Sequence, residues 1–388
     1  MIKIAIITKY YNSANYGGLL QAYALTHYLQ SIGYDAFQIC FDEKSVKSKS
    51  VTSDLSGRFS SLTFIEKVKR ILKRIKTKIS VYATRLFLKN KNKLRRQAFT
   101  SFRESIPHTS TVYNSNTISD VNPKADIFIT GSDRVWSERS IGDEYYLSFV
   151  KSAKKIAYAV SLRANELNKN QKEAMAAAVE KIDAVSVREK ETVRILSEIT
   201  NKKIEHVLDP TFLLDKTEWA EIAGKDPFEC ESQYIFCYFL GDDIKNRRLV
   251  KQFAKNKKLK IITLPYSKES FNLADVSFGD IRLTQVSPNR FLYLIKNASY
   301  VFTDSFHASV FSIIFHRQFF IMPRNEIKGS GTRIESLVSV AGIENRYCEN
   351  TDKYTLLSLD DIDYNAVDGR IQQYRESSVA FLNNAVNQ

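Results

Sequence analysis

The chain has 388 residues, a length that favours two or three domains over one. Apolar residues make up 44% and charged residues 26%, with only 13 Gly and 7 Pro, which excludes a disordered, collagenous or disulfide-stapled chain. The formal net charge is +14, but residues 67–96 hold thirteen Lys or Arg and no acidic residue, so the basic character is local and does not indicate a general nucleic-acid-binding protein.

The cysteines and the N-terminus indicate where the protein works. Cys40, Cys230, Cys237 and Cys348 lack the spacing of a metal or redox motif, which favours reduced, buried thiols in a cytosolic protein. No run approaches the roughly 18 apolar residues of a membrane-spanning helix. The N-terminal segment also lacks the features of a signal peptide. We therefore expect a cytoplasmic protein.

Strands and helices are predicted to alternate through the first half of the chain. The strand candidates are 2–7, 34–40, 125–130, 155–160, 183–187 and 205–208, and the helical segments include 19–29 and 171–181. Such alternation is typical of parallel βαβ units, so we expect an α/β fold with a parallel sheet.

A second alternating set follows a polar stretch at 224–228. Its predicted strands are 233–240, 259–264, 299–303 and 318–322, and its helices 243–256, 288–297 and 305–314. We predict two α/β domains joined by a linker near 225–232. The tail is expected to be helical at 371–386, and the sequence leaves open whether it packs back on the first domain.

The basic stretch lies in an insertion at about 64–97. Apolar residues recur in it at intervals of three and four, from Ile65 and Val68 to Ile79, which predicts an amphipathic basic helix. Two interpretations stay open: a surface helix docked on the first domain, or a contact with anionic membrane. Nucleic acid is the least favoured partner, because no binding motif accompanies the charge.

Two arginines are predicted to lie where anions bind, near helix N-termini that follow strands. Ser186 and Glu189 have capping-box spacing, which would place Arg188 in the first helical turn. Gly329-Ser-Gly331 leads into a second such box, with Arg333 just inside its helix. A cation there opposes the helix dipole at a cost of about 0.3–1 kcal/mol unless an anion is bound. The alternative is a partner carboxylate within the same domain.

A histidine is predicted at a third strand end. The strand at 299–303 leads into Asp304-Ser305-Phe306-His307, and if Ser305 caps the following helix, His307 lies in its first turn. We interpret His307 as an acid–base candidate, with a buried structural histidine as the alternative. The other histidines have no matching nucleophile, and Asp361-Ile-Asp363 is a poor metal candidate. The sequence lacks the phosphate-loop, dinucleotide-binding and nucleophile-elbow motifs.

Six short motifs, taken in this order, resemble the polysaccharide pyruvyl transferase family from residue 1 to about 345. They are Asn15-Tyr-Gly-Gly18, Ala125-Asp-Ile-Phe-Ile-Thr-Gly-Ser-Asp133 with Val135-Trp136, Ser186-Val-Arg-Glu189, Asp209-Pro-Thr-Phe212, Asp304-Ser-Phe-His307 and Gly329-Ser-Gly-Thr-Arg333. The resemblance implies a GT-B-like pair of Rossmann-type domains around the active site: residues 1–225 for the acceptor, 232–345 for the donor, and a tail at 346–388.

The resemblance also implies phosphoenolpyruvate as donor and a pyruvate ketal on sugar hydroxyls as product. The acceptor would be a surface-glycan precursor, in some pathways still attached to a polyprenyl diphosphate, so the protein would work at the inner face of the membrane. The scheme requires no metal and no cofactor. The alternatives are a nucleotide-sugar glycosyltransferase of the same architecture, and a non-catalytic binder of anionic lipid or nucleic acid.

Roles follow for individual residues. We predict His307 as the catalytic acid–base and Asp133 as the base for the acceptor hydroxyl. The phosphate and carboxylate of the donor would be bound by Arg188, Arg333, Ser305, Ser330 and Gly331. The two arginines would make forked hydrogen bonds to them. The acceptor would be lined by Asn15, Tyr16, Gly17, Gly18, Ser132 and Trp136. Ser305 stands where family members often carry an arginine, so one anion contact lacks a residue.

Overall fold

The computed structural model describes residues 1–43, 93–137, 140–163, 167–224, 233–265, 273–324, 331–349 and 352–387. Most of the basic segment, residues 67–92, lies outside these ranges, as do the predicted linker at 225–232 and Ser330. The amphipathic helix proposed there stays a prediction. Residues 93–96 belong to a helical stretch that continues to residue 104.

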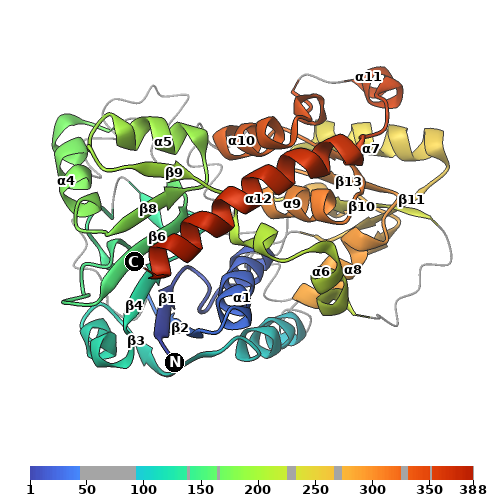
Figure 1. The fold of residues 1–388 in the computed structure, drawn as a ribbon. Helices are drawn as coiled ribbons and strands as arrows, with labels where there is room; N and C mark the ends of the chain where they lie inside the picture. The colour runs from blue at the N-terminus through green and yellow to red at the C-terminus, as the bar shows by residue number, and fades with distance from the viewer. Residues whose placement is uncertain are drawn as a thin grey trace, which may run out of the picture.

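The first domain is built on a parallel sheet with the strand order β3-β2-β1-β4-β6-β8-β9 (Figure 1). The strands are β1 (Lys3–Ile7), β2 (Asp35–Phe41), β3 (His108–Tyr113), β4 (Ile127–Thr130), β6 (Lys154–Val160), β8 (Ala184–Val187) and β9 (Ile204–His206). The central strands are apolar and buried on both sides, as expected for a parallel sheet that helices cover. A separate pair, β5 (Trp136–Ser137) and β7 (Leu162–Arg163), lies beside it.

The labelled helices of this half are α1 (Tyr16–Ser31), α4 (Lys169–Val179), α5 (Lys190–Ser197) and α6 (Lys216–Ala223). All of these except α5 begin at a side-chain cap. The Asn15 side chain accepts the Gly17 N–H at the start of α1, and α6 begins with a capping box between Asp215 and Glu218. Short 3-10 turns are η1 (Ile118–Lys124), η2 (Glu144–Tyr146), η3 (Pro210–Leu213), η4 (Leu273–Asp275) and η5 (Glu344–Arg346).

The second domain repeats the architecture with the strand order β12-β11-β10-β13-β14. Its strands are β10 (Tyr234–Tyr238), β11 (Lys260–Thr263), β12 (Ile281–Arg282), β13 (Tyr300–Thr303) and β14 (Gln318–Ile321). Its helices are α7 (Ile244–Lys257), α8 (Pro288–Lys296), α9 (Phe306–Ile314), α10 (Gly331–Ala341) and α11 (Lys353–Ser358). Two parallel sheets of Rossmann type are therefore present, as the sequence predicted.

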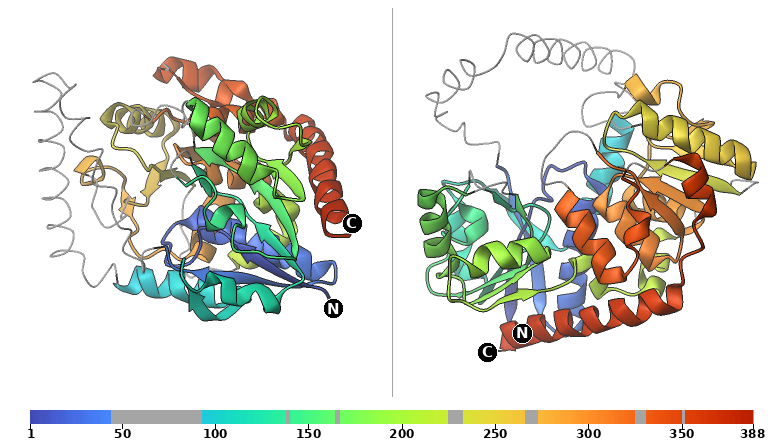
Figure 2. Two further views of the ribbon diagram at one scale, coloured as in Figure 1. Left: turned by 90° about the vertical axis from the view of Figure 1, so that its left-hand side faces the viewer. Right: turned by 90° about the horizontal axis from the view of Figure 1, so that it is seen from above.

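The last helix, α12 (Tyr364–Asn387), crosses both domains (Figures 1 and 2). At its start the Tyr364 hydroxyl donates to the Ser312 carbonyl of the second domain. Further along, the Ser378 hydroxyl accepts the Leu208 N–H of the first domain at 2.9 Å. The tail therefore packs back on the first domain, which settles the arrangement that the sequence left open.

Aromatic side chains join the two domains. Tyr16, the first residue of α1, is 2% exposed, and its ring stacks on Phe291 of α8 with centroids 4.3 Å apart. The Tyr16 hydroxyl donates to the Val286 carbonyl at 2.9 Å. The start of α1 is thus fixed against the second domain, and this contact positions the functional site below. Within the residues described, no helix is both long and apolar enough to cross a bilayer.

Candidate functional site

Polar side chains from both domains meet where the strands of their sheets end. In the first domain, Asp133 follows β4, Arg188 follows β8 and Asp209 follows β9. In the second domain, His307 lies in the first turn of α9, directly after β13, and Arg333 lies in the first turn of α10. Carboxyl ends of parallel strands are the usual ligand-binding edge of such sheets, so this meeting point is the candidate active site.

Arg188 is the centre of a buried network. Its side chain is 3% exposed. Nε donates to Glu189 at 3.0 Å, and Nη1 donates to the Ser132 hydroxyl at 2.9 Å and to Asp209 at 2.6 Å. Although burial disfavours its charge, Glu189 and Asp209 raise the pKa of Arg188, which therefore stays protonated. Three of its N–H groups are thus used within the protein. In this conformation Arg188 therefore cannot make the forked contact with the donor substrate that the sequence predicted.

Asp209 joins the arginine to the imidazole. Its Oδ1 accepts from the backbone and hydroxyl of Thr211, and its Oδ2 accepts from Ser132 and Arg188. His307 Nε2 lies 3.5 Å from the same Oδ2, an electrostatic contact longer than a good hydrogen bond. Burial alone would raise the pKa of Asp209, but His307 and Arg188 have the larger combined effect and lower it. The Asp209 carboxylate is therefore ionised.

The His307 ring lies directly against the first turn of α1. A Cβ added to Gly17 would come within 1.9 Å of His307 Nδ1 and 2.4 Å of its Cγ. Only glycine leaves room for the imidazole here, because real Cβ contacts below 3.0 Å essentially do not occur. Gly17 therefore brings the first domain against the catalytic candidate of the second.

Asp133 and Arg333 face each other across the same region. Asp133 Oδ1 lies 3.9 Å from Arg333 Nη1. Asp133 and Arg134 both have positive φ, 72° and 60°, a costly conformation for residues other than glycine that is found often at functional sites. Burial raises the pKa of Asp133, but His307, Arg188 and Arg333 outweigh it, so the net effect lowers that pKa. Burial, with Arg134 and Arg188, lowers the pKa of Arg333 to about 9.

Several nitrogen atoms of this cluster have no hydrogen-bond partner. Among the residues described, Arg188 Nη2, Arg333 Nε and His307 Nε2 are buried and unsatisfied. Leaving such groups unpaired costs about 1–3 kcal/mol each, and more for charged groups. The helices α1, α9 and α10 also carry no acidic residue in their first turns. Unpaired cationic donors beside uncompensated helix N-termini are the features of an anion site.

Some of the predicted acceptor residues lie in this cluster, and the others serve other parts of the fold. Ser132 and Gly17 belong to it, through Arg188 and His307. Trp136 is fully buried in the first domain, stacked on Tyr146, and its indole N–H donates to the Tyr145 carbonyl. The remaining three serve the start of α1: Asn15 as its cap, Tyr16 as the domain contact above, and Gly18 against the Lys9 carbonyl.

Two predictions about helix starts are wrong in their local geometry. Ser186 does not cap a helix: it lies inside β8, donates to the Ala157 carbonyl and accepts the Ala159 N–H, both of β6. Helix α5 starts only at Lys190, so Arg188 precedes the helix instead of lying in its first turn. The second predicted box also fails as a cap, because α10 begins at Gly331, before the box's first residue, although Arg333 does lie in the first turn.

Of the two predicted donor-side serines, Ser305 lies within the described residues. Ser305 occupies the N-cap position of α9 as expected, but its side chain makes no capping hydrogen bond, and its carbonyl accepts from the Ser309 hydroxyl. Ser330 lies outside the described residues. Gly331 is the first residue of α10.

The sequence did not single out two members of the cluster. In the sequence, Asp209 stands out only as part of a family motif, and Glu189 only by its capping-box spacing from Ser186. The signal for Asp209 was its place directly after a strand and before Pro210, where its side chain caps η3. A buried carboxylate at a strand end of a parallel sheet is a candidate for such a role.

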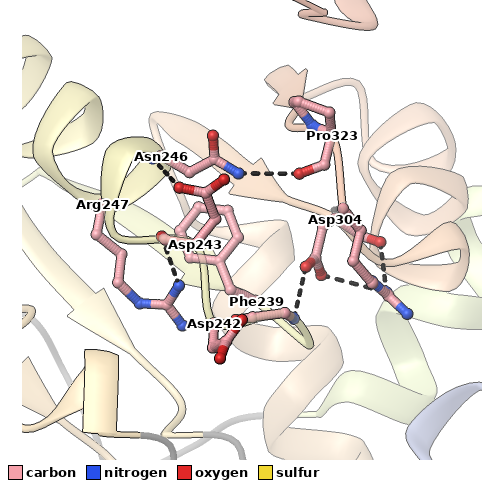
Figure 3. Close-up of a pocket in the computed structure, with 9 residues that line it drawn as sticks. Phe239, Asp242, Asp243, Asn246, Arg247, Asp304 and Pro323 are labelled. Carbon is pink, nitrogen blue, oxygen red and sulfur yellow. Dashed lines mark hydrogen bonds and ion pairs between the residues drawn. The ribbon is translucent and has the colours of Figure 1, made fainter. Parts of the chain in front are cut away.

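A separate small pocket lies in the second domain, between the ends of β10 and β13 (Figure 3). The strand order reverses at this place, so it is the topological switch point of that sheet. The Asp304 carboxylate lines it and accepts the Leu240 N–H at 2.6 Å and the Gly241 N–H at 2.7 Å. Asp242 and Asp243 also line the pocket, as do Arg247 and Arg324, and Arg324 Nη2 lies 3.3 Å from Asp304 Oδ1.

Comparison with solved structures shows the class of fold. The UDP-GlcNAc 2-epimerase of Methanocaldococcus jannaschii, in complex with UDP-GlcNAc and UDP, is similar over 96% of this chain and 93% of that chain, with 14% identity and a TM-score of 0.50. A second structure of that epimerase covers 96% and 91% at 12% identity, with a TM-score of 0.51. The S. aureus MnaA–UDP structure covers 97% and 91% at 12% identity, with a TM-score of 0.50. The protein is a two-domain Rossmann-like protein of GT-B type.

The family follows from the sequence match. The family model for polysaccharide pyruvyl transferase matches residues 15–326, and the chain belongs to that family. No curated protein matches the chain significantly. The matched range contains every described residue of the cluster except Arg333, which lies just beyond its end. No group of three or more potential metal ligands occurs among the residues that the structure describes.

Proposed function

We propose that the protein transfers the enolpyruvyl group of phosphoenolpyruvate to a sugar of a surface-polysaccharide precursor and closes it into a pyruvate ketal, releasing phosphate. The observation that carries this is the set of unpaired, buried nitrogen atoms on Arg188, Arg333 and His307. They come from both domains and suit a small compound with a phosphate and a carboxylate. Family membership supports the transfer reaction in general.

In the proposed complex neither arginine contacts the donor substrate through two nitrogen atoms at once. Only Nη2 of Arg188 is available, because its other donors serve Glu189, Ser132 and Asp209. Arg333 offers Nε, and its one ion pair among the described residues is with Asp133 at 3.9 Å. The two arginines would thus each contribute an edge of the anion site, and no cofactor besides the donor substrate is needed.

His307 is the proposed acid. Protonation of the donor's methylene carbon gives an oxocarbenium-like centre, a sugar hydroxyl attacks it, phosphate leaves, and a second hydroxyl of the sugar closes the ring. An imidazole suits the proton transfer because it titrates near neutral pH. Gly17 and Asp209 hold the ring in place. His307 Nε2 lies 3.5 Å from Asp209 Oδ2, which is too far for a tight hydrogen bond that would occupy this nitrogen.

Asp133 is the proposed acceptor-side carboxylate. Its lowered pKa keeps it ionised at neutral pH but makes it a weak base. We therefore propose that it orients the attacking hydroxyl by accepting its hydrogen bond, and that proton removal is completed as the new bond forms. Its ion pair with Arg333 and its electrostatic interaction with His307 support that role.

The pocket of Figure 3 favours this donor over a nucleotide sugar. A diphosphate at the switch point would need the N–H groups of Leu240 and Gly241, but Asp304 already accepts both. A nucleotide-sugar donor would therefore have to displace Asp304 from these two N–H groups.

The test supplies the two donor classes separately with a glycan acceptor and measures the acceptor's gain in mass. A pyruvate ketal supports the proposal, and a gain of one hexose refutes it. His307→Gln should abolish phosphate release from phosphoenolpyruvate. Near-native release in that variant would remove His307 from the mechanism.

We further propose that the acceptor is attached to a polyprenyl diphosphate and that residues 67–96 bring the protein to the inner face of the membrane. The support is the cationic, amphipathic sequence of that segment. Neutralising Lys69, Arg70, Lys73 and Arg74 should weaken binding to anionic vesicles, most at low salt. Equal binding before and after the change would contradict this part of the proposal.

A further inference from the structure

One aromatic ring contacts three groups of the anion site. Phe306, the first residue of α9, is 6% exposed. The guanidinium carbon of Arg188 lies 4.2 Å from the centre of its ring, and that of Arg333 lies 5.9 Å away. The His307 imidazole meets the ring at 5.1 Å, with 90° between the planes. None of the roles described above uses this ring.

The two arginines need such a neighbour, because they repel each other. Arg188 is one of the charges that lower the pKa of Arg333, and the nearest carboxylate oxygen to Arg333 in the described residues is 3.9 Å away. The face of an aromatic ring is negative and attracts a cation within about 6 Å of its centre, most strongly where water is excluded. A ring can therefore hold both guanidinium groups without occupying their N–H donors, as a carboxylate would.

We propose that Phe306 is a positioning residue whose ring holds Arg188 of the first domain beside Arg333 of the second, so that both present free N–H groups to one anion. The inference rests on the proposed function only for the identity of that anion as phosphoenolpyruvate. An aliphatic side chain of similar size fills the same space but offers no negative face. Without it, Arg333 would turn toward Asp133 and lose its alignment with Arg188.

The experiment replaces Phe306 by phenylalanines with one, two and three ring fluorines, and also by leucine (Phe306→Leu). Fluorine withdraws electron density from the ring face and hardly changes the shape. Calorimetry measures the affinity for phosphoenolpyruvate and, separately, for inorganic phosphate. Both affinities should fall stepwise with each fluorine, and Phe306→Leu should bind about 5- to 30-fold more weakly.

Phe311 is the matched control. It lies in the same helix, is fully buried, and packs against Trp219 and Phe315 instead of an arginine. The same fluorinated residues at position 311 should leave both affinities unchanged. A fall of equal size at 306 and 311 would mean that fluorine acts through packing, and the inference would be wrong.

The two anions separate this inference from the proposed function. If the wild-type protein binds both anions and the series at 306 has constant affinity, Phe306 only fills space, although the donor assignment stands. If it binds phosphate but not phosphoenolpyruvate, the proposed function fails, and the phosphate series still decides the role of the ring. Binding of neither anion would overturn both, because there would be no anion for the ring to serve.

Discussion

Gly17→Ala isolates the effect of the imidazole position on the reaction. The added Cβ would lie 1.9 Å from His307 Nδ1, and ordinary contact begins at 3.4 Å, so the two must separate by about 1.5 Å. The first turn of α1 cannot retreat freely, because Tyr16 is stacked on Phe291 and bonded to the Val286 carbonyl. The ring of His307 must therefore move, and its contact with Asp209 is lost.

The expected cost falls on catalysis more than on stability. A displacement of about 1 Å in a catalytic group lowers rates by about 100-fold, so kcat/KM should fall by at least about that factor. Overpacking costs about 1–3 kcal/mol, and the better helix propensity of alanine returns about 1 kcal/mol. The net loss, about 2 kcal/mol or less, leaves most molecules folded.

The assay combines phosphate release from phosphoenolpyruvate, thermal unfolding, and the nitrogen chemical shifts of the His307 imidazole. Gly369→Ala is the matched control: Gly369 lies in α12 with nothing within 4 Å of the added Cβ. This control should keep full activity and gain about 0.5–1 kcal/mol of stability. Wild-type kcat/KM and unchanged imidazole shifts in Gly17→Ala would refute the reasoning.

Three other outcomes follow from the charges of the site. Donor affinity should fall as the pH rises through about 9, because Arg333 then becomes neutral and no longer attracts an anion; calorimetry between pH 7 and 10 checks this, and a constant affinity would contradict it. Arg188→Lys should raise the donor KM at least about tenfold, since an ammonium group cannot keep the contacts to Ser132 and Asp209 and also reach the donor; an unchanged KM would disprove this. Asp209→Asn should lower the free energy of unfolding at pH 7 by about 3–5 kcal/mol, because it leaves Arg188 underpaired in the interior. Because the pKa of Asp209 is lowered in the folded state, its contribution to stability is complete above about pH 4 and is lost as the pH falls further, so the stability difference between wild type and variant should shrink in acid. Denaturant titrations at pH 7 and 3.5 measure this stability difference. A loss below about 1 kcal/mol at pH 7 would argue against the buried pair.

The fold was predictable where burial dominates the local sequence. Runs such as Ile4–Ile7 and Tyr234–Tyr238 are apolar because helices cover both faces of a parallel sheet, and they were found as strands. The edge strand β3 (His108–Tyr113) was missed, because one side is exposed and its sequence, HTSTVY, is largely polar. This segment is a strand because it pairs with β2, and its own sequence contains no pattern that predicts this pairing.

The site was predictable residue by residue but not as a network. Arg188, Arg333 and His307 carried a signal, since each is a charged or titratable residue next to a strand end or helix start. The Ser186 spacing suggested a cap, but a spacing of three residues does not show whether the strand has already ended. The roles of Asp209 and Phe306 depend on contacts with Arg188 across 21 and 118 positions of the chain, and no local pattern reports such contacts.

The long final helix has a consequence for how the protein is made. Its Ser378 supports the backbone at Leu208, one residue before the carboxylate that anchors the buried arginine. During synthesis, at about 5–20 residues per second, the first domain leaves the ribosome well before this support exists. The backbone beside the anchoring carboxylate therefore receives this support only when Ser378 has been made and α12 has packed back on the first domain, and a truncation that removes Ser378 should leave Arg188 less firmly held.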